Sequence, residues 1–136
     1  AIEMLRIPEW VEKITHLDQD VLNILLAGKV NFIDGKYNTR FSINYELKDD
    51  VVNPVNDKTV FIHYVGPTKP WHEWANYPVS QSFLDAKKHS PWQNVELLKP
   101  VNSNQYRYCA KHKFRQGKTL QGILSYINYY KNKLIK

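Results

Sequence analysis

The stretch "FIHYVGPTKPW", residues 61–71, joins a strand-like run to a loop rich in proline and glycine. Residues 59–65 are mostly β-branched or aromatic and a Gly-Pro turn signal follows at once, so the pattern predicts a short strand ending near residue 65. Side chains alternate along a strand, which predicts Ile62 and Tyr64 on one face and His63 on the other. A titratable side chain is therefore expected at the end of an apolar element.

Residues 66–71, called the hook below, form a loop with a restricted backbone. Gly66 lets a ligand approach the main chain closely, and the two prolines of the hook limit φ. The His63 imidazole, the open main chain at Gly66 and the Lys69 ammonium together suit a metal-bound diphosphate. A structural explanation stays open beside this one, because strand histidines and Gly-Pro loops are common where no ligand binds.

Length and composition indicate one soluble domain. The chain of 136 residues is long enough for one hydrophobic core, and its 43% hydrophobic and 24% charged residues are typical of globular proteins. No apolar run reaches the ~20 residues that span a bilayer, and the N-terminus lacks the layout of a signal peptide. We expect a cytoplasmic protein, and the single cysteine, Cys109, agrees with a reducing compartment.

Charge is distributed unevenly along the chain. Residues 1–60 hold seven basic and ten acidic side chains, whereas residues 61–136 hold twelve basic and three acidic ones. The segment 99–136 has nine basic side chains, no acidic one and six interleaved aromatic rings. Such a segment favours an anionic partner, and both nucleic acid and acidic lipid qualify.

Two helices are expected near the N-terminus. Apolar spacing predicts the first over residues 7–14, with Pro8 in its first turn. The second is expected from about residue 18, capped by Asp18 or its neighbour, to Gly28. Its predicted apolar face consists of Val21, Leu22, Leu25 and Leu26.

Strands are expected over residues 30–33 and 39–47, in addition to the strand before the hook. Residues 49–57, between Lys48 and Lys58, are expected to form an exposed loop.

Helices dominate the predicted second half. Ser82 and Asp85 have the spacing of a capping box at the start of a helix that ends before Ser90. Asn102 is expected to cap the next helix and Gly117 to end it. A last helix is expected to carry an apolar stripe formed by Leu120, Ile123, Leu124, Ile127 and Leu134. With strands in the first half and helices in the second, the predicted fold class is α+β and helix-rich.

The triplet "DQD", residues 18–20, is a candidate pair of active carboxylates. Helix capping by Asp18, with an acidic first turn, is the simpler explanation. The triplet also fits the Asp-x-Asp metal motif of nucleotide-sugar enzymes, but that motif ends a strand, whereas this triplet opens a helix. We therefore do not assign it as the metal pair.

Other common chemical motifs are weak or missing. Cys109 and His112 have the spacing of two zinc ligands, but no second pair of comparable spacing exists. The sequence has no phosphate-binding loop of the Gly-x-x-x-x-Gly-Lys type, no Gly-x-Ser-x-Gly elbow and no Gly-x-Gly-x-x-Gly fingerprint.

Several segments taken together resemble glycosyltransferase family 8, the retaining nucleotide-sugar transferases. They are "DQDVLNILLAGKV" (18–30), "KYN" (36–38) and "IHYVGPTKPWHEWANYP" (62–78). The continuation, "SPWQNVELLKP" (90–100) and "QYRYCAKHKFRQGKTLQGILSYINYYKNK" (105–133), is similar to bacterial members that add glucose or galactose to the lipopolysaccharide core. The pattern His-x-x-Gly-x-x-Lys-Pro-Trp is the most specific part of the resemblance.

The resemblance implies roles for the hook. In the family, the histidine of this pattern binds the Mn²⁺ (or Mg²⁺) that bridges the nucleotide diphosphate, and the glycine and lysine contact the phosphates. These positions are His63, Gly66 and Lys69 here, and the implied donor is UDP-glucose or UDP-galactose.

The triplet 18–20 also receives a role from the resemblance. Asp18, Gln19 and Asp20 would lie against the donor sugar, with Asp18 binding its hydroxyls and Gln19 facing the anomeric carbon. An amide is a poor nucleophile, unlike the carboxylate of retaining glycosidases. Retention by a same-face, ion-pair-like route is therefore implied.

Family members are about twice as long as this chain. The resemblance therefore implies a C-terminal fragment of a GT-A type (α/β) transferase, without the nucleotide-binding βα units and the Asp-x-Asp metal pair. Residues 1–80 would be the incomplete catalytic domain and residues 81–136 a basic, aromatic, helical extension. The chain alone is expected to be inactive.

The basic extension fits an anionic glycolipid acceptor, the lipopolysaccharide core, at the cytoplasmic face of the inner membrane. Each basic side chain near an anionic surface contributes on the order of 1 kcal/mol, so peripheral attachment is expected. One alternative is that the last helix packs on the catalytic domain through Leu120, Ile123 and Ile127. Another is a nucleic-acid-binding module formed by residues 99–136. The proposed membrane contacts are Lys111, Lys113, Arg115 and Lys118.

Overall fold

The computed structural model describes residues 7, 8 and 15–134. The chain divides into two compact units, residues 1–34 and 35–136, which are described separately below. The helix predicted over residues 7–14 lies outside the described residues except for Ile7 and Pro8.

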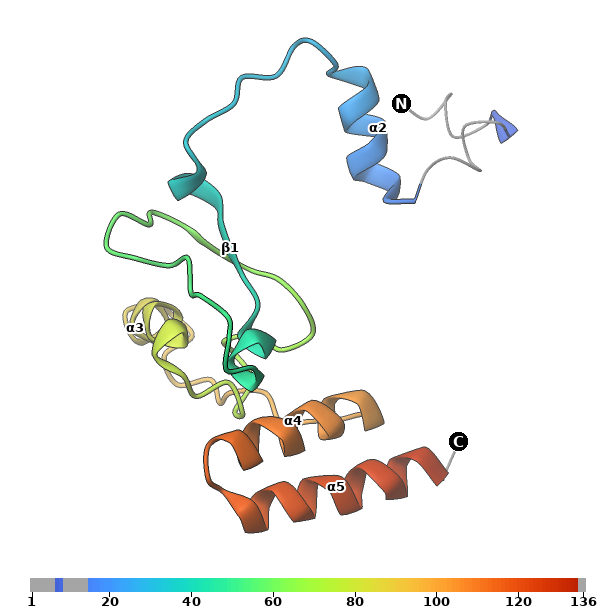
Figure 1. Ribbon diagram of the computed structural model, residues 1–136, viewed down its shortest axis with the longest axis vertical. Coiled ribbons are helices and arrows are strands. Elements are labelled where there is room, and N and C mark those ends of the chain that lie inside the picture. Colours follow the sequence, from blue (N-terminus) through green and yellow to red (C-terminus); the bar gives the residue numbers. More distant parts are fainter. Residues whose placement is uncertain (1–6, 9–14, 135–136) are drawn as a thin grey trace. The chain divides into compact units, whose positions relative to one another are not determined.

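The N-terminal unit contains helix α2, Leu17–Leu25 (Figure 1). Gly28, with φ +74°, follows it in the left-handed conformation that commonly ends a helix, as predicted. Of the predicted apolar face, Val21 is buried, whereas Leu22, Leu25 and Leu26 are exposed.

The C-terminal unit begins with two short parallel strands, β1 (Thr39–Phe41) and β2 (Ile62–Tyr64). Phe41 pairs with Tyr64 at one end of the ladder, and Val65 N–H then donates to the Phe41 carbonyl at 2.9 Å. Ile62 and Tyr64 pack on the core while His63 is exposed, which confirms the predicted alternation. The buried core is small and consists of Phe41, Ile43, Ala75 and Val79.

The strand predicted over residues 39–47 is wrong beyond Phe41. The backbone turns at Ser42 into a 3₁₀ helix, Ile43–Leu47, which brings Ile43 into the core at 0% exposure. The strand predicted over residues 30–33 is also wrong, since this segment has no regular structure. Both segments have strand-like composition, but residues 30–33 pair with no strand among the described residues, and β propensity depends on such partners.

Helix α3, Gln81–Lys88, follows a 3₁₀ turn over Pro78–Ser80. The predicted capping box is wrong, because the helix begins before Ser82 and its N-cap position, Ser80, makes no side-chain cap hydrogen bond. Asp85 instead accepts from the Gln81 side chain at 2.8 Å. The helix ends before Ser90, as predicted.

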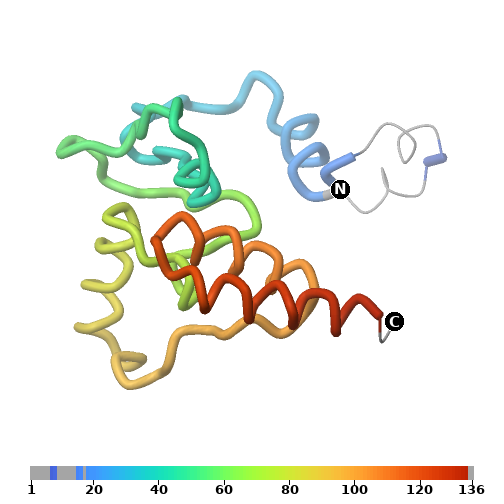
Figure 2. The backbone as a smooth tube through the Cα atoms, turned by 60° about the horizontal axis from the view of Figure 1, so that its bottom comes forward, coloured from blue at the N-terminus to red at the C-terminus, as the bar shows by residue number. Residues whose placement is uncertain are grey.

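Helices α4 (Ser103–Arg115) and α5 (Thr119–Leu134) form an antiparallel pair in both views (Figures 1 and 2). The Asn102 side chain accepts from Gln105 N–H at 3.0 Å, which confirms the predicted cap. Gly117, with φ +72°, ends α4 as predicted.

The alternative in which the last helix packs through Leu120, Ile123 and Ile127 is not seen within this unit, because all three side chains are exposed. Helix α5 packs on α4 through Gly122, where a Cβ atom would lie 2.9 Å from the Phe114 ring, and through Ser125, whose hydroxyl lies 3.4 Å from Cys109 Sγ. A glycine permits this close approach, and it turns the stripe away from α4. The stripe, called the outer face of α5 below, is therefore exposed, and it consists of Leu120, Ile123, Leu124, Ile127 and Leu134.

Candidate functional site

His63 lies at the centre of β2, on the exposed side of the two-stranded ladder. Its Nδ1 lies 3.0 Å from Asn38 Oδ1, and because an amide oxygen only accepts, Nδ1 carries the hydrogen. The Nε2 lone pair is then the one presented to a ligand. A hydrogen bond on one ring nitrogen is the usual way in which a metal-binding histidine is oriented, so the ring fits a role as one metal ligand.

Asn38 is a residue whose function the sequence did not reveal. It ends the 3₁₀ helix Gly35–Asn38 just before β1, and it reaches His63 across 25 residues of sequence. The segment "KYN" contributed to the family resemblance, but no local pattern assigned a task to its asparagine.

Gly66 has a structural requirement of its own. Its φ is +82°, and a Cβ atom there would lie 2.8 Å from Ser42 Oγ. Any other residue would strain the backbone and collide with Ser42. The contact of Gly66 with phosphate, which the sequence suggested, stays a prediction.

Lys69 is half-buried and turns back toward the end of β2. Its Nζ donates to the Tyr64 carbonyl at 2.6 Å, and its main-chain N–H donates to His72 Nδ1 at 3.2 Å. An ammonium has three hydrogens, so donors remain for a phosphate. The His72 ring stacks on buried Trp74 with 4.2 Å between centroids, and burial followed by the charge of Lys69 lowers the pKa of His72.

The centre of the hook is attached to α4 by a polar group of four residues, called the His112 cluster, in which Thr68 and His112 are buried and Asn44 and Tyr77 are half-buried. His112 Nε2 lies 3.2 Å from Thr68 Oγ1 and 3.0 Å from Asn44 Oδ1, while Nδ1 lies 2.8 Å from the Tyr77 hydroxyl. Burial, and then the positive ends of His72 and Lys111, lower the pKa of His112 to about 4. His112 therefore contributes a neutral ring to this cluster, and its spacing to Cys109 had been only a weak indication of a zinc ligand.

The triplet 18–20 lies in the first turn of α2, in the other unit. Asp18 and Gln19 are exposed. Asp20 Oδ2 accepts from the main-chain N–H groups of Thr15 and His16, each at 2.8 Å, and these bonds lower the pKa of Asp20. The N-cap position is His16, which makes no side-chain cap hydrogen bond, so the predicted capping by Asp18 or its neighbour is wrong.

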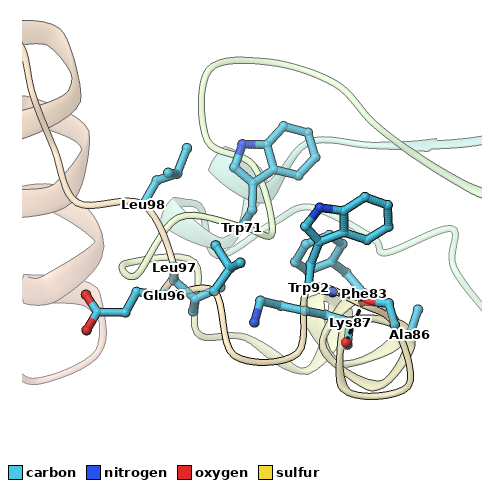
Figure 3. A pocket seen from close by; sticks show the side chains of 10 residues that line it. Trp71, Phe83, Ala86, Lys87, Trp92, Glu96, Leu97 and Leu98 are labelled. Atoms are coloured by element: carbon cyan, nitrogen blue, oxygen red, sulfur yellow. Dashed lines mark hydrogen bonds between the residues drawn. The ribbon is translucent and has the colours of Figure 1, made fainter.

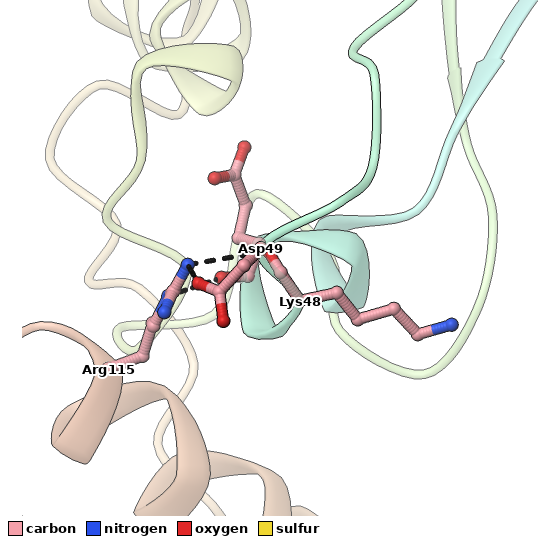
Figure 4. Close-up of polar contacts among 4 residues, drawn as sticks. Lys48, Asp49 and Arg115 are labelled. Atoms are coloured by element: carbon pink, nitrogen blue, oxygen red, sulfur yellow. Dashed lines mark hydrogen bonds and ion pairs between the residues drawn. The ribbon is translucent and has the colours of Figure 1, made fainter.

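The basic side chains predicted at a membrane have different surroundings. Lys111 and Lys118 are exposed and Lys113 is half-buried. Arg115 instead binds the end of the 3₁₀ helix Ile43–Leu47 and the residues that follow it: Nε donates to the Glu46 carbonyl at 2.9 Å, and Nη2 pairs with Asp49 at 2.6 Å (Figure 4).

An apolar pocket of about 500 Å³ lies at the end of the hook (Figure 3). Concave, mostly apolar surfaces with a few polar groups are typical ligand sites. Lys87 and Glu96 supply charged groups here. The apolar wall includes Trp71, Phe83, Trp92, Val95, Leu97 and Leu98.

Two absences concern the described part of the chain. No three or more His, Cys, Asp or Glu side chains gather there as a metal site. No helix of residues 7, 8 and 15–134 has the length and apolar character needed to cross a bilayer.

Comparison with known proteins covers the whole chain. Residues 1–75 match the family model Glycosyl transferase family 8, and residues 77–133 match Glycosyl transferase family 8 C-terminal. No solved structure matches the chain.

Curated relatives are lipopolysaccharide sugar transferases. The chain is 62% identical over all 136 residues to the lipopolysaccharide 1,3-galactosyltransferase of Salmonella typhimurium strain LT2. It is 58% identical over 98% of its length to the lipopolysaccharide glucosyltransferase WaaO of Escherichia coli K12, and 36% identical over 88% to a lipopolysaccharide 1,2-glucosyltransferase of Escherichia coli. The chain spans 40% of the length of the first two relatives and 36% of the third. The two family matches together establish that the chain belongs to glycosyltransferase family 8.

Proposed function

We propose that this chain is part of a retaining transferase that moves glucose or galactose from UDP to the lipopolysaccharide core. One observation carries the proposal. A chain 62% identical to a lipopolysaccharide galactosyltransferase places an oriented imidazole, His63, on the strand that leads into a glycine-lysine hook. We propose a GT-A type catalytic domain over residues 1–80 and a helical extension over residues 81–136. Family matches that meet between residues 75 and 77 support this division.

The diphosphate site is formed by His63, Gly66 and Lys69. His63 would hold a divalent ion, Mn²⁺ or Mg²⁺, through Nε2, with Asn38 orienting the ring. When bound, that ion stabilises negative charge on the departing diphosphate. Gly66 leaves the main chain accessible, and Lys69 supplies a positive charge beside the end of β2.

The donor sugar is assigned to Asp18, Gln19 and Asp20. The Asp20 carboxylate accepts from the Thr15 and His16 main-chain N–H groups, so its contribution is to hold the start of α2, while the exposed side chains of Asp18 and Gln19 would bind the sugar hydroxyls. The Gln19 amide is not a nucleophile of the glycosidase type, which favours a same-face route to retention.

Peripheral attachment to the cytoplasmic face of the inner membrane is assigned to the α4–α5 pair. Lys111, Lys113 and Lys118 would contact anionic headgroups, and the exposed outer face of α5 would insert between them. Arg115 is left out of this surface because its guanidinium binds Glu46 and Asp49. The match of residues 77–133 to a glycosyltransferase model favours this role over nucleic-acid binding.

The test uses a chimeric transferase in which this chain replaces the matching segment of the Salmonella typhimurium galactosyltransferase. The wild-type chimera should transfer hexose from UDP-sugar to core acceptor in the presence of Mn²⁺. His63→Ala should reduce the rate on the order of 100-fold or more, because a ligand of the ion is lost. His89→Ala is the matched control, since His89 is an exposed histidine that bonds only within its own segment, to the Asp85 carbonyl. Near wild-type transfer by His63→Ala at limiting Mn²⁺ would refute the assignment.

A further inference from the structure

Thr68 attaches the hook to α4 by a buried hydrogen bond. In sequence it stands between Gly66 and Lys69, the residues assigned to the diphosphate. Its Oγ1 lies 3.2 Å from His112 Nε2, and both residues have 0% exposure. A hydrogen bond to helix α4 therefore fixes the segment that would contact phosphate.

One tautomer of His112 satisfies its three neighbours. Asn44 Oδ1 only accepts, so Nε2 carries the hydrogen and shares it between Asn44 and Thr68 Oγ1. Nδ1 then accepts the hydrogen of the Tyr77 hydroxyl. Burial lowers the pKa of His112 to about 4, so this neutral arrangement is the one present at neutral pH.

The hook is thus fixed at three places. Gly66 lies against Ser42, just after β1, and Lys69 Nζ bonds to the Tyr64 carbonyl of β2. Thr68, between them, bonds to α4. Hydrogen bonds fix direction as well as distance, and a loop that is ordered before its ligand arrives loses less conformational entropy on binding.

We propose that His112 is a positioning residue for nucleotide binding, which holds the hook in its binding conformation through Thr68 without touching the substrate. This inference rests on the proposed function and deepens it, because the positioned residues are those assigned to the diphosphate. It also assigns the C-terminal helices a part in donor binding, beyond any contact with a membrane.

The first experiment measures amide hydrogen exchange in the full 136-residue chain and requires no activity. The reporters are Lys69 N–H, which donates to His72 Nδ1, and His72 N–H, which donates to the Lys69 carbonyl. Val65 N–H, which bonds to Phe41, is the reference within the adjoining strand. Thr68→Val should accelerate exchange of the reporters about tenfold or more relative to Val65, because the hook opens locally.

Two further variants make this result specific. Thr68→Ser retains the hydroxyl, so the ratio of the exchange rates of the reporters to that of Val65 should equal the wild-type ratio. Val79→Ala removes apolar core volume without removing a member of the His112 cluster, and should not change the ratio. Wild-type exchange in Thr68→Val, or equal acceleration in Val79→Ala, would overturn the inference.

The second experiment measures kinetics in the chimeric transferase. A positioning residue acts on donor binding in the ground state and the transition state alike, so Thr68→Val should raise the KM for UDP-sugar about tenfold with little change in kcat. Loss of kcat with unchanged KM would overturn the positioning role. A wild-type chimera that neither binds UDP nor transfers hexose would refute the proposed function, whereas the exchange result would still decide whether His112 holds the hook.

Discussion

In the hook and the segments around it, polar side chains are buried: Thr68 and His112 have 0% exposure and are paired with each other. On the outer face of α5 the reverse holds, since Leu120 is 78% exposed and Leu134 is 84% exposed. A buried polar group costs free energy unless it is paired, so the hook is stable only while its partners stay in place. Exposed apolar groups contribute little to the stability of the chain, and they are available for contact with something else. The two regions should therefore respond in opposite ways to substitution.

The largest expected effect on stability is that of His112→Ala. Removal of the ring leaves buried Thr68 and half-buried Asn44 and Tyr77 without their shared partner and opens a cavity. We expect a loss of about 3–5 kcal/mol in the free energy of unfolding. Urea unfolding followed by tryptophan fluorescence measures it, because Trp71, Trp74 and Trp92 all lie in the C-terminal unit.

The control for this variant is Lys111→Ala, at the exposed neighbouring position on the same helix. Its effect should stay within about 0.5 kcal/mol. A loss below 1 kcal/mol in His112→Ala would show that the cluster is not what stabilises this region.

The second prediction concerns pH. Burial lowers the pKa of His112 to about 4, whereas an unfolded histidine has a pKa of about 6.5. Between these values the unfolded chain binds a proton that the folded chain does not. The contribution of neutral His112 to the free energy of unfolding is therefore complete above pH 6.5 and is lost as the pH falls toward 4. The free energy of unfolding should decrease by up to about 3 kcal/mol over this window.

The decrease should be smaller in His112→Gln, which has no proton to gain. Part of it should persist, because the pKa of neighbouring His72 is also lowered, with the same sign. Urea titrations of both proteins between pH 7 and pH 4 measure the difference. If the free energy of unfolding falls equally steeply with pH in both proteins, His112 is not the titrating group.

The third prediction concerns Gly66. Gly66→Ala should cost about 2 kcal/mol in stability, because φ +82° is strained for alanine and the new Cβ meets Ser42 Oγ at 2.8 Å. Ser42→Ala removes that oxygen, so the double variant should lose less stability than the sum of the two single variants. A double-mutant cycle measures this coupling. If the stability losses of the two single variants simply add up in the double variant, the backbone conformation alone requires glycine at position 66.

The residues that could be predicted are those whose structure depends on their neighbours in sequence. The alternation around His63, the Asn102 cap and the Gly117 helix end depend on local spacing, and all three are present in the structure. Ser82 shows the limit of such patterns. Its spacing to Asp85 suits a capping box, but the preceding 3₁₀ turn leads directly into the helix one residue earlier.

The contacts that could not be predicted join segments far apart in sequence. His63 and Asn38 are 25 residues apart, and His112 and Asn44 are 68 residues apart. No local pattern states which polar residue will be buried beside which other. Helical spacing likewise identified the apolar stripe of α5, but spacing cannot say what covers an apolar face, and here α4 binds the opposite side through Gly122.

The smallest expected effect on stability is at the outer face of α5. Leu120→Gln combined with Leu124→Gln retains helix propensity and exchanges only exposed apolar surface, so the free energy of unfolding should change by no more than about 0.5 kcal/mol. Binding to vesicles containing anionic lipid should nevertheless weaken by at least about tenfold, because inserting a leucine contributes roughly 1.5–3 kcal/mol. Co-sedimentation measures this loss.

Two comparisons separate insertion from charge and from general hydrophobicity. Replacing Lys111, Lys113 and Lys118 by Gln should remove the salt-sensitive part of vesicle binding and leave the apolar part, whereas the double leucine variant should do the reverse. Val52→Gln is the matched control, since Val52 is 86% exposed in a loop and should affect neither property. If the double leucine variant sediments like wild type, the outer face does not insert into lipid. If it loses more than about 1 kcal/mol of stability, the face packs within the protein, and the contrast between the hook and α5 fails.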